Sequence, residues 1–248
     1  MSTSAHLLEP VLAFQRRLLA WYHRHQRKLP WRETTDPYHI LVSEIMLQQT
    51  QVDRVVPKYR QFLRRYPTVK SLARAKTTEL RRLWYPLGYN VRPLRLRRIA
   101  QRALQEHDGR IPDSYDALLA MDGIGKYTAG AVLSFAFNQD APIVDTNVAR
   151  LLSRYFGVRG HAKQGTTPGL RRGAAGRQRR LWRLAKEVIP RGKAYLINQA
   201  MMDLGATVCT ARAPQCPACP LRRTCRSYPI LHAPRKTPTT SSRRHRRH

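Results

Sequence analysis

The sequence predicts an all-α protein, and two observations support this fold class. Apolar residues recur at intervals of three and four along much of the chain, the spacing of one buried helical face. In contrast, no run alternates apolar and polar side chains between hairpin turns, as a half-buried strand would. We therefore expect helices packed on helices and no sheet.

Composition limits the class of protein further. The 248 residues, 42% of them hydrophobic, can form one large or two modest domains with a real core. The formal net charge is +31, which favours a polyanionic partner, although a generally basic, ribosome-type protein would share it. No secretory signal or membrane-span pattern is found. We expect a soluble, cytoplasmic monomer whose partner is nucleic acid.

Two helical stripes are clear in the first half of the chain. The first contains Tyr38, Leu41, Val42, Ile45 and Met46, and the second follows Pro93 with Leu94, Leu96, Ile99, Ala100, Ala103 and Leu104.

A pair of helices separated by glycines comes next. Residues 112–121 begin with an acidic first turn, and Gly123 and Gly125 separate them from the apolar run at 126–137. These glycines let the backbone approach a ligand, and the amides at the start of the second helix can bind an anion. The pattern predicts a hairpin that grips a phosphate, with Lys126 beside it. A glycine helix cap and a surface lysine are the plainer interpretations.

Two segments break the helical pattern. Residues 157–180 are rich in Gly and Arg, and we expect a mobile basic loop. Residues 226–248 carry many cations and no acid, so we expect a disordered tail that attracts DNA.

Four cysteines form a cluster near the end of the chain. Cys209, Cys216, Cys219 and Cys225 have the spacing C-x6-C-x2-C-x5-C. Thiolates so close together bind an iron-sulfur cluster or zinc, and the presence of only one C-x2-C pair favours iron-sulfur. Four unligated core thiols would be an oxidation hazard.

Two of the few carboxylates lie in apolar surroundings. Glu44 has no cation three or four residues away, so burial would raise its pKa and suit it to general acid catalysis. An exposed helical Glu is the alternative. Asp145 precedes a helical run, where it can cap the helix and also stabilise positive charge on a sugar.

Several motifs together resemble MutY-type adenine DNA glycosylases of the helix-hairpin-helix, or endonuclease III, superfamily. They are LPWR (29–32), DPY (36–38), VSEIMLQQTQV (42–52), LGY (87–89), GIGKYTAGAVLS (123–134), VDTNVAR (144–150) and NQAMMDLGA (198–206). The cysteine spacing resembles the 4Fe-4S loop of the same enzymes.

This resemblance implies an architecture and a function. The helix-hairpin-helix fold would have a six-helix barrel domain at 31–140 and an iron-sulfur cluster domain from residues 1–30 and 141–225, with the active site in the cleft between them. The chain would bind mismatched or damaged double-stranded DNA and hydrolyse the N-glycosidic bond of a flipped-out base in base-excision repair. Adenine opposite guanine or 8-oxoguanine is the expected target.

The resemblance also implies residue roles. By it, Glu44 protonates adenine, Asp145 stabilises the oxocarbenium-like sugar, and Tyr127 and Asn147 support them. Gln49 and Tyr89 match residues that wedge into the duplex, although a surface amide and a core aromatic are the plainer interpretations. Three further residues match positions lining the pocket and DNA face, namely Arg27, Trp31 and Arg32.

Two departures from the family pattern qualify this expectation. Tyr127 stands where bifunctional relatives carry a Schiff-base lysine, which predicts a monofunctional enzyme. Only 23 residues follow Cys225, so we expect a short form without the usual 8-oxoguanine-recognition domain. A thymine or uracil mismatch glycosylase of the same superfamily is the main alternative, and a non-catalytic iron-sulfur DNA-binding protein is another.

Overall fold

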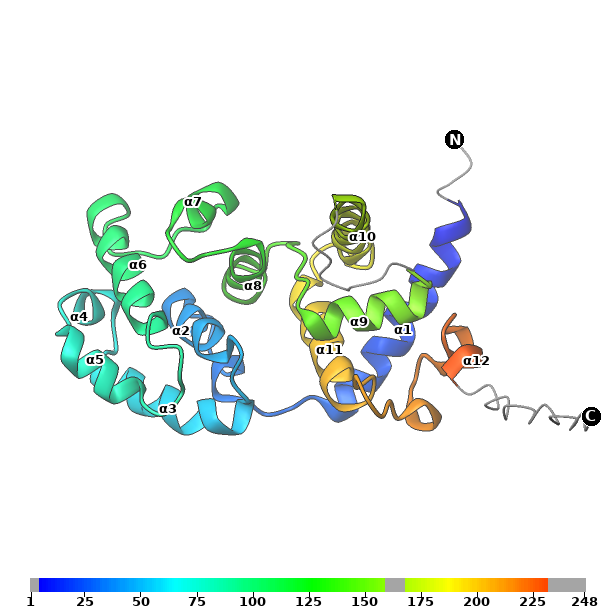
Figure 1. Cartoon of the computed structure of the whole chain (residues 1–248), viewed down its shortest axis with the longest axis horizontal. Coiled ribbons are helices and arrows are strands. Elements are labelled where there is room, and N and C mark those ends of the chain that lie inside the picture. Colours follow the sequence, from blue (N-terminus) through cyan, green and yellow to red (C-terminus); the bar gives the residue numbers. More distant parts are fainter. Residues whose placement is uncertain (1–4, 159–167, 232–248) are drawn as a thin grey trace, which may run out of the picture.

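Helices form the regular structure of the chain throughout the described residues, 5–158 and 168–231 of a computed structural model (Figure 1). The α-helices are α1 (Ala5–His25), α2 (Pro37–Leu47), α3 (Val52–Arg65), α4 (Val69–Ala73), α5 (Thr77–Trp84), α6 (Arg92–Glu106), α7 (Tyr115–Ala120), α8 (Lys126–Ala136), α9 (Thr146–Phe156), α10 (Pro168–Glu187), α11 (Ala194–Thr207) and α12 (Tyr228–Leu231). Short 3-10 helices lie at Pro30–Arg32, Cys216–Ala218 and Arg222–Thr224. These ranges contain no strand, so the all-α prediction is confirmed.

The helices pack around two hydrophobic cores. Helices α2 to α8 enclose the first, whose largest fully buried side chains include Phe62, Tyr66 and Trp84. Helices α1, α9, α10 and α11 enclose the second, where Phe14 packs against Tyr155 with ring centroids 5.0 Å apart. In Figure 1 the two groups lie at opposite ends of the long axis, with α8 and α11 between them. Helix α11 contacts α8 as well as α1 and α9, so it joins the two cores.

Helix α2 illustrates how local sequence sets these elements. The Asp36 side chain accepts hydrogen bonds from the amides of Tyr38 (2.7 Å) and His39 (3.2 Å), and Pro37 occupies the first helical position. From Ile40 to Met46 every side chain is buried. A helix buried on all sides lies inside the protein rather than on its surface.

A buried ion-pair network ties the segment after α1 to α11. Asp203 on α11 is fully buried and accepts hydrogen bonds from Arg27 Nε (2.6 Å), Arg32 Nη1 (2.8 Å) and Arg32 Nη2 (2.8 Å). Burial alone would raise the pKa of Asp203, but Arg32 and Arg27 hold it below its ordinary value. The network therefore fixes the chain where it passes from one core to the other.

The prediction of a loop at 157–180 is wrong for residues 168–180, because α10 begins at Pro168. The apolar residues that anchor this helix, Leu181, Leu184 and Ala185, are buried but lie beyond the range taken as a loop. Arginine and alanine favour helices and partly offset the cost of the glycines. Residues 159–167 lie outside the described part of the chain.

The start of the predicted disordered tail also needs correction. The amides of Arg226 and Ser227 donate to the carbonyls of Tyr155 (3.1 Å) and Arg154 (3.1 Å), and α12 follows. Two backbone hydrogen bonds to α9 therefore hold the first tail residues in place. Residues 232–248 lie outside the described part. Within the described ranges, no helix has the length and apolar character needed to cross a bilayer.

Replacing Asp203 by Asn should destabilise the fold strongly. The side chain of Arg32 is only 7% exposed, and an unpartnered buried charge costs about 3–5 kcal/mol. Urea unfolding at pH 7 measures this loss. Asp122→Asn is the matched control, since Asp122 forms an exposed pair with Arg98 and should contribute less than about 1 kcal/mol.

Acid sensitivity gives a second readout of the same pair. The pKa of Asp203 is lower in the folded state, so its stabilisation is present above the unfolded pKa of about 3.9 and is lost as pH falls through the folded pKa. The wild type should lose this part of its stability in that acid range, and Asp203→Asn should not. Equal stability of the two proteins at neutral pH would contradict the assignment.

Candidate active site

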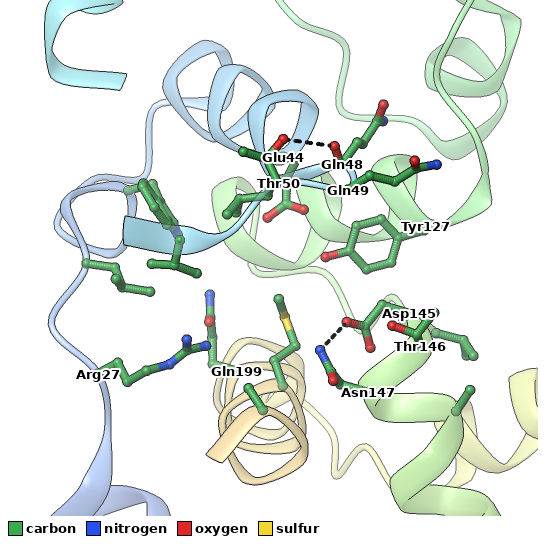
Figure 2. Close-up of a pocket in the computed structure, with 18 of the residues that line it drawn as sticks. Arg27, Glu44, Gln48, Gln49, Thr50, Tyr127, Asp145, Thr146, Asn147 and Gln199 are labelled. Atoms are coloured by element: carbon green, nitrogen blue, oxygen red, sulfur yellow. Dashed lines mark hydrogen bonds between the residues drawn. The ribbon is translucent and has the colours of Figure 1, made fainter. Parts of the chain in front are cut away.

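A cavity of about 940 Å³ lies where the two cores meet (Figure 2). Its walls come from the segment after α1, from α2 and the turn that follows it, and from α8 to α11. The polar and aromatic side chains that line it are Arg27, Trp31, Arg32, Glu44, Gln48, Gln49, Thr50, Tyr127, Asp145, Thr146, Asn147, Arg177, Gln178 and Gln199. Residues distant in sequence thus share one concave site.

Glu44 is the buried acid of this cavity. It sits on α2 and is 3% exposed, and its Oε2 atom has no hydrogen-bond partner. Burial raises the pKa of Glu44 to about 7; the nearby Asp145 carboxylate adds to this rise, while the Tyr127 hydroxyl and Arg32 oppose it. The alternative of a solvent-exposed Glu44 is therefore wrong. A carboxyl group with this pKa can hold a proton near neutral pH and still give it up.

Asp145 faces the cavity from the other core. It caps α9 by accepting a hydrogen bond from the Val148 amide (2.6 Å), and it also accepts one from Asn147 Nδ2 (3.1 Å). These two donors fix the orientation of the Asp145 carboxyl group at the start of the helix. Figure 2 shows Glu44 and Asp145 on facing walls, with the Tyr127 ring between them.

Asn147 is held in turn by the segment that leads to the cysteines. Its Oδ1 accepts from Arg150 Nη2 (2.7 Å), and Arg150 also donates to the carbonyls of Gly205 (2.6 Å) and Cys209 (2.7 Å). A Cβ atom at Gly205 would lie 2.9 Å from the Asn147 side chain, so only glycine permits this approach. Arg150 thus links the Asn147 side chain, which donates to Asp145, to the backbone of the first cysteine.

The glycine hairpin brings Tyr127 to the cavity. Gly123 has φ +93°, a conformation that side chains disfavour, and Gly125 is the residue before α8. Tyr127, the second residue of α8, lines the cavity, whereas Lys126 is exposed and does not. Burial raises the pKa of Tyr127 well above its usual range, with the carboxylates of Glu44 and Asp145 adding to it, so the hydroxyl stays protonated. The hairpin glycines and Lys126 lie outside the cavity.

The remaining predicted residues divide into two groups. The first group lines the cavity and consists of Arg27, Trp31 and Arg32. Both arginines form ion pairs with Asp203. Gln49 is exposed at the cavity edge, and Tyr89 is 59% exposed, so the interpretation of Tyr89 as a core aromatic is wrong.

Sequence reasoning did not single out six polar residues that line the cavity, namely Gln48, Thr50, Thr146, Arg177, Gln178 and Gln199. Gln199 on α11 is 3% exposed and lines the cavity, and its motif, NQAMMDLGA, had marked the segment without singling it out. Arg177 and Gln178 were assigned to the predicted loop, but α10 places them in the cavity wall. No periodicity in the sequence indicates these placements.

The four cysteines line one small apolar cavity beside α9. All four are free thiols, and Arg154 Nη1 lies 3.4 Å from Cys209 Sγ. Burial raises the pKa of Cys219 to about 11, with a backbone hydrogen bond opposing and the other three thiols adding to the rise. Within the described ranges the side chains are not drawn together into a metal-binding group. Four thiols that line one apolar enclosure nevertheless make a donor set that suits a thiophilic metal group.

A family model confirms the superfamily that the motifs indicate. Residues 42–172 match the model of the HhH-GPD superfamily base excision DNA repair protein. The chain belongs to this superfamily. The matched range includes Glu44, the glycine hairpin and Asp145.

Curated relatives are adenine DNA glycosylases. The enzyme of Mycobacterium tuberculosis is 43% identical over 206 residues, 82% of this chain and 64% of that protein. The human enzyme is 38% identical over 226 residues, 88% of this chain and 40% of that protein. The chain thus spans between 40% and 64% of the length of these two relatives.

Solved structures share the fold. A thermostable thymine-DNA glycosylase superposes with a TM-score of 0.78 at 30% identity, covering 90% of this chain and 98% of that one. Endonuclease III trapped in a covalent intermediate with DNA superposes with a TM-score of 0.74 at 21% identity, covering 93% and 99%. The helix-hairpin-helix glycosylase fold is therefore confirmed.

Replacing Glu44 by Gln should change how stability depends on pH. The pKa of Glu44 is higher in the folded protein (about 7) than its ordinary value of 4.5, so folding favours the protonated form. Wild-type stability should fall by up to about 3 kcal/mol as pH rises between these two values and then stay level. Glu44→Gln should lack this fall and be more stable than the wild type above pH 7.

Chemical unfolding at several pH values measures this effect. Glu106→Gln, at an exposed pair with Arg102, is the control and should keep the wild-type profile. If Glu44→Gln followed the wild type through the same range, Glu44 would not carry the raised pKa.

Proposed function

We propose that the chain is a monofunctional DNA glycosylase that hydrolyses the N-glycosidic bond of adenine turned out of a mispair with guanine or 8-oxoguanine. The observation that carries this proposal is the buried, protonatable Glu44 facing the capped carboxylate of Asp145 across one cavity. Glycosidic bonds are cleaved by such pairs, with one carboxyl as acid and the other as stabilising anion. We also propose that the two cores correspond to a barrel domain at 31–140 and a cluster domain formed by 1–30 and 141–225.

The two carboxyl groups divide the reaction between them. The protonated Glu44 carboxyl gives its proton to a ring nitrogen of the base as the bond from that base to the sugar C1′ breaks and its electron pair moves to the base. Asp145 stabilises the positive charge that develops on the sugar. A water molecule then adds its oxygen to C1′ and loses a proton, which leaves free base and an abasic sugar. This reaction needs no amine nucleophile, which agrees with the presence of Tyr127 at the position where bifunctional relatives carry a lysine.

The cavity suits a nucleobase removed from the helix. Chemistry on a base requires that it leave the stack, at a cost of a few kcal/mol. Trp31 and Leu47 supply apolar surface, and the Gln199 amide can both donate to and accept from a base edge. Gln49 and Tyr89 would fill the space that the base leaves, while the amides after Gly125 and the Lys126 ammonium would hold a backbone phosphate.

We propose that Cys209, Cys216, Cys219 and Cys225 hold a 4Fe-4S cluster. Bound there, such a cluster would cross-link the C-terminal loop and serve a structural rather than a hydrolytic role. The residues of this chain that the loop organises are Arg150 and Arg154, which donate to the backbone of 209–211. Zinc is the other metal that fits four thiolates. A cytoplasmic location, where thiols stay reduced and DNA is accessible, accords with this proposal.

Two observations differ on which base is released. The curated relatives are named adenine DNA glycosylases, whereas the thymine-DNA glycosylase matches nearly the full length of its own chain here. Gln199 and Glu44 offer donors and acceptors to the base, which suits the varied edge of a purine. We therefore place adenine first and thymine opposite guanine second.

Single-turnover base release tests this proposal. Labelled duplexes contain A opposite G, A opposite 8-oxoguanine, T opposite G or U opposite G. We expect release of adenine, reduced at least about a hundredfold in Asp145→Asn, since removing one stabilising group at a transition state typically costs that much. Release of thymine or uracil instead would establish the second candidate. Release of no base from any duplex would contradict the function.

Metal content tests the cluster. We expect the purified wild type to contain iron and sulfide and to absorb visible light. Cys219→Ser should lose both the metal and thermal stability, since such sites contribute folding free energy. Thr210→Ser, in the same loop but outside the proposed ligand set, is the control. Zinc without iron would contradict the cluster but leave the ligand set intact.

A further inference from the structure

The loop between α5 and α6 exposes an unusual amount of apolar surface. Tyr85 is 72% exposed, Tyr89 is 59% exposed and Val91 is 45% exposed. In the described part of the chain only seven large hydrophobic side chains are exposed, and three of them lie within these seven residues. A concentration of this kind on one loop marks a contact surface rather than random exposure.

Arginine side chains hold the backbone of this loop by hydrogen bonds. Arg92 is 3% exposed, and its guanidinium donates to the carbonyls of Leu87 (3.0 Å) and Gly88 (3.1 Å). The guanidinium also lies 5.4 Å from the Tyr89 ring centroid. Arg54 on α3 adds a hydrogen bond to the Pro86 carbonyl (2.6 Å). Two arginines therefore fix the loop backbone from two other elements.

The same guanidinium holds the turn that follows α2. Arg92 donates to the carbonyls of Ile45 (3.1 Å), Met46 (2.8 Å) and Gln48 (2.5 Å) and to Thr50 Oγ1 (3.0 Å). Since Gln48 and Thr50 line the cavity, Arg92 links the exposed loop to residues of the cavity edge. No carboxylate pairs with Arg92 among the described residues, so its partners are almost entirely backbone atoms of these two segments.

Both segments carry a non-glycine residue in the left-handed region. Gln49 has φ +55° and Tyr89 has φ +49°. Such residues persist only where neighbouring contacts determine the conformation, and they concentrate at functional sites. Arg92 bonds the carbonyls that precede both residues, those of Gln48 and Gly88, so it holds the backbone at both positions.

We propose that Tyr85 adds a second stacking surface to the duplex contact already expected of Tyr89, so that the loop Tyr85–Val91 forms a base-stacking platform for unpaired bases of DNA. Tyr85 is a contact additional to those expected from the motifs, and Arg92 is the positioning residue of the platform. The ligand class is an unstacked nucleobase, and this inference rests on the proposed action on DNA. Aromatic side chains accept any base by stacking, each worth about 1–3 kcal/mol.

The surroundings favour DNA over a protein partner. Arg54, which bonds the loop at Pro86, and Arg81, whose carbonyl accepts from the Tyr85 amide, are exposed, and the whole chain carries a net charge of +31. Exposed aromatics interleaved with cations are the arrangement that binds single-stranded or distorted nucleic acid. Arg92 also links the loop to the edge of the cavity that would receive the flipped base, where the unpaired bases would be.

Binding measurements with the full chain test the platform independently of base release. In a Glu44→Gln background, affinity is measured for a duplex with one A·G mismatch and for the fully paired duplex, at several salt concentrations. Tyr85→Ala should weaken mismatch binding about tenfold, with paired binding and the salt slope unchanged, because stacking releases no counterions. Tyr85→Phe should bind like the parent, and Tyr115→Ala, an exposed tyrosine on α7, is the control.

Arg92→Gln tests the positioning role, with Arg97→Gln as its control on the same helix. Arg97 is half-buried and donates to Thr77 rather than to the platform. A 2-aminopurine at the target position reports extrusion of the base by its fluorescence. Arg92→Gln should reduce mismatch affinity and this fluorescence rise, whereas Arg97→Gln should change neither. Unfolding curves of both variants correct for any loss of folded protein.

The outcomes separate the platform from the proposed function. If the pattern of Tyr85 and Arg92 variants holds but the wild type releases no base, the platform stands and the glycosylase proposal fails. If Tyr85→Ala binds mismatched DNA like the parent, or loses paired and mismatched binding alike, the platform is wrong. It is also wrong if the parent protein does not distinguish the two duplexes.

Discussion

Burial of the Glu44 carboxyl group is the constraint around which the site is arranged. A carboxyl in water is ionised at neutral pH, and only removal from water, without a cation to pair with it, keeps its proton available. The fold meets this requirement by placing Glu44 on α2, which is buried on all sides, and by committing the nearby Arg32 to Asp203. An Arg32 free to pair with Glu44 would lower the pKa that burial raises. The ion pair that joins the two cores thus also protects the protonation state of the proposed acid.

The second carboxylate is treated in the opposite way. Asp145 accepts hydrogen bonds from an amide and a side-chain donor at the start of a helix, while Glu44 has one oxygen without any partner. Two acids in one cavity thereby have different surroundings, one buried with an unpartnered oxygen and one hydrogen-bonded at a helix start, and such a difference suits them to different roles. The chain of contacts from Asp145 through Asn147 and Arg150 to the Cys209 carbonyl extends this control to the cysteine loop. Order in the cysteine loop therefore affects the orientation of the Asp145 carboxyl group.

Sequence alone predicted the features that depend on residues close together in the chain. The helical spacing after Tyr38 gave α2, the cation-free neighbourhood of Glu44 predicted its burial, and the position of Asp145 predicted its helix cap. Long-range partners were beyond such reasoning. A buried arginine bonded to carbonyls of two loops, as Arg92 is, has no sequence pattern, and neither has the Asp203 network. Helix α10 was missed because glycine and arginine dominate its first half, whereas the apolar residues that anchor it come later.

The rate of adenine release as a function of pH tests the central claim most directly. It is measured in single turnover on a duplex with adenine opposite guanine, between pH 5 and 9, for the wild type and for Glu44→Gln. If Glu44 supplies the proton, the wild-type rate should be level in acid and fall about tenfold per pH unit above its pKa of about 7, and the variant should be slow throughout. A wild-type rate that stays constant from pH 6 to 9, or a variant that keeps the wild-type rate, would contradict the account.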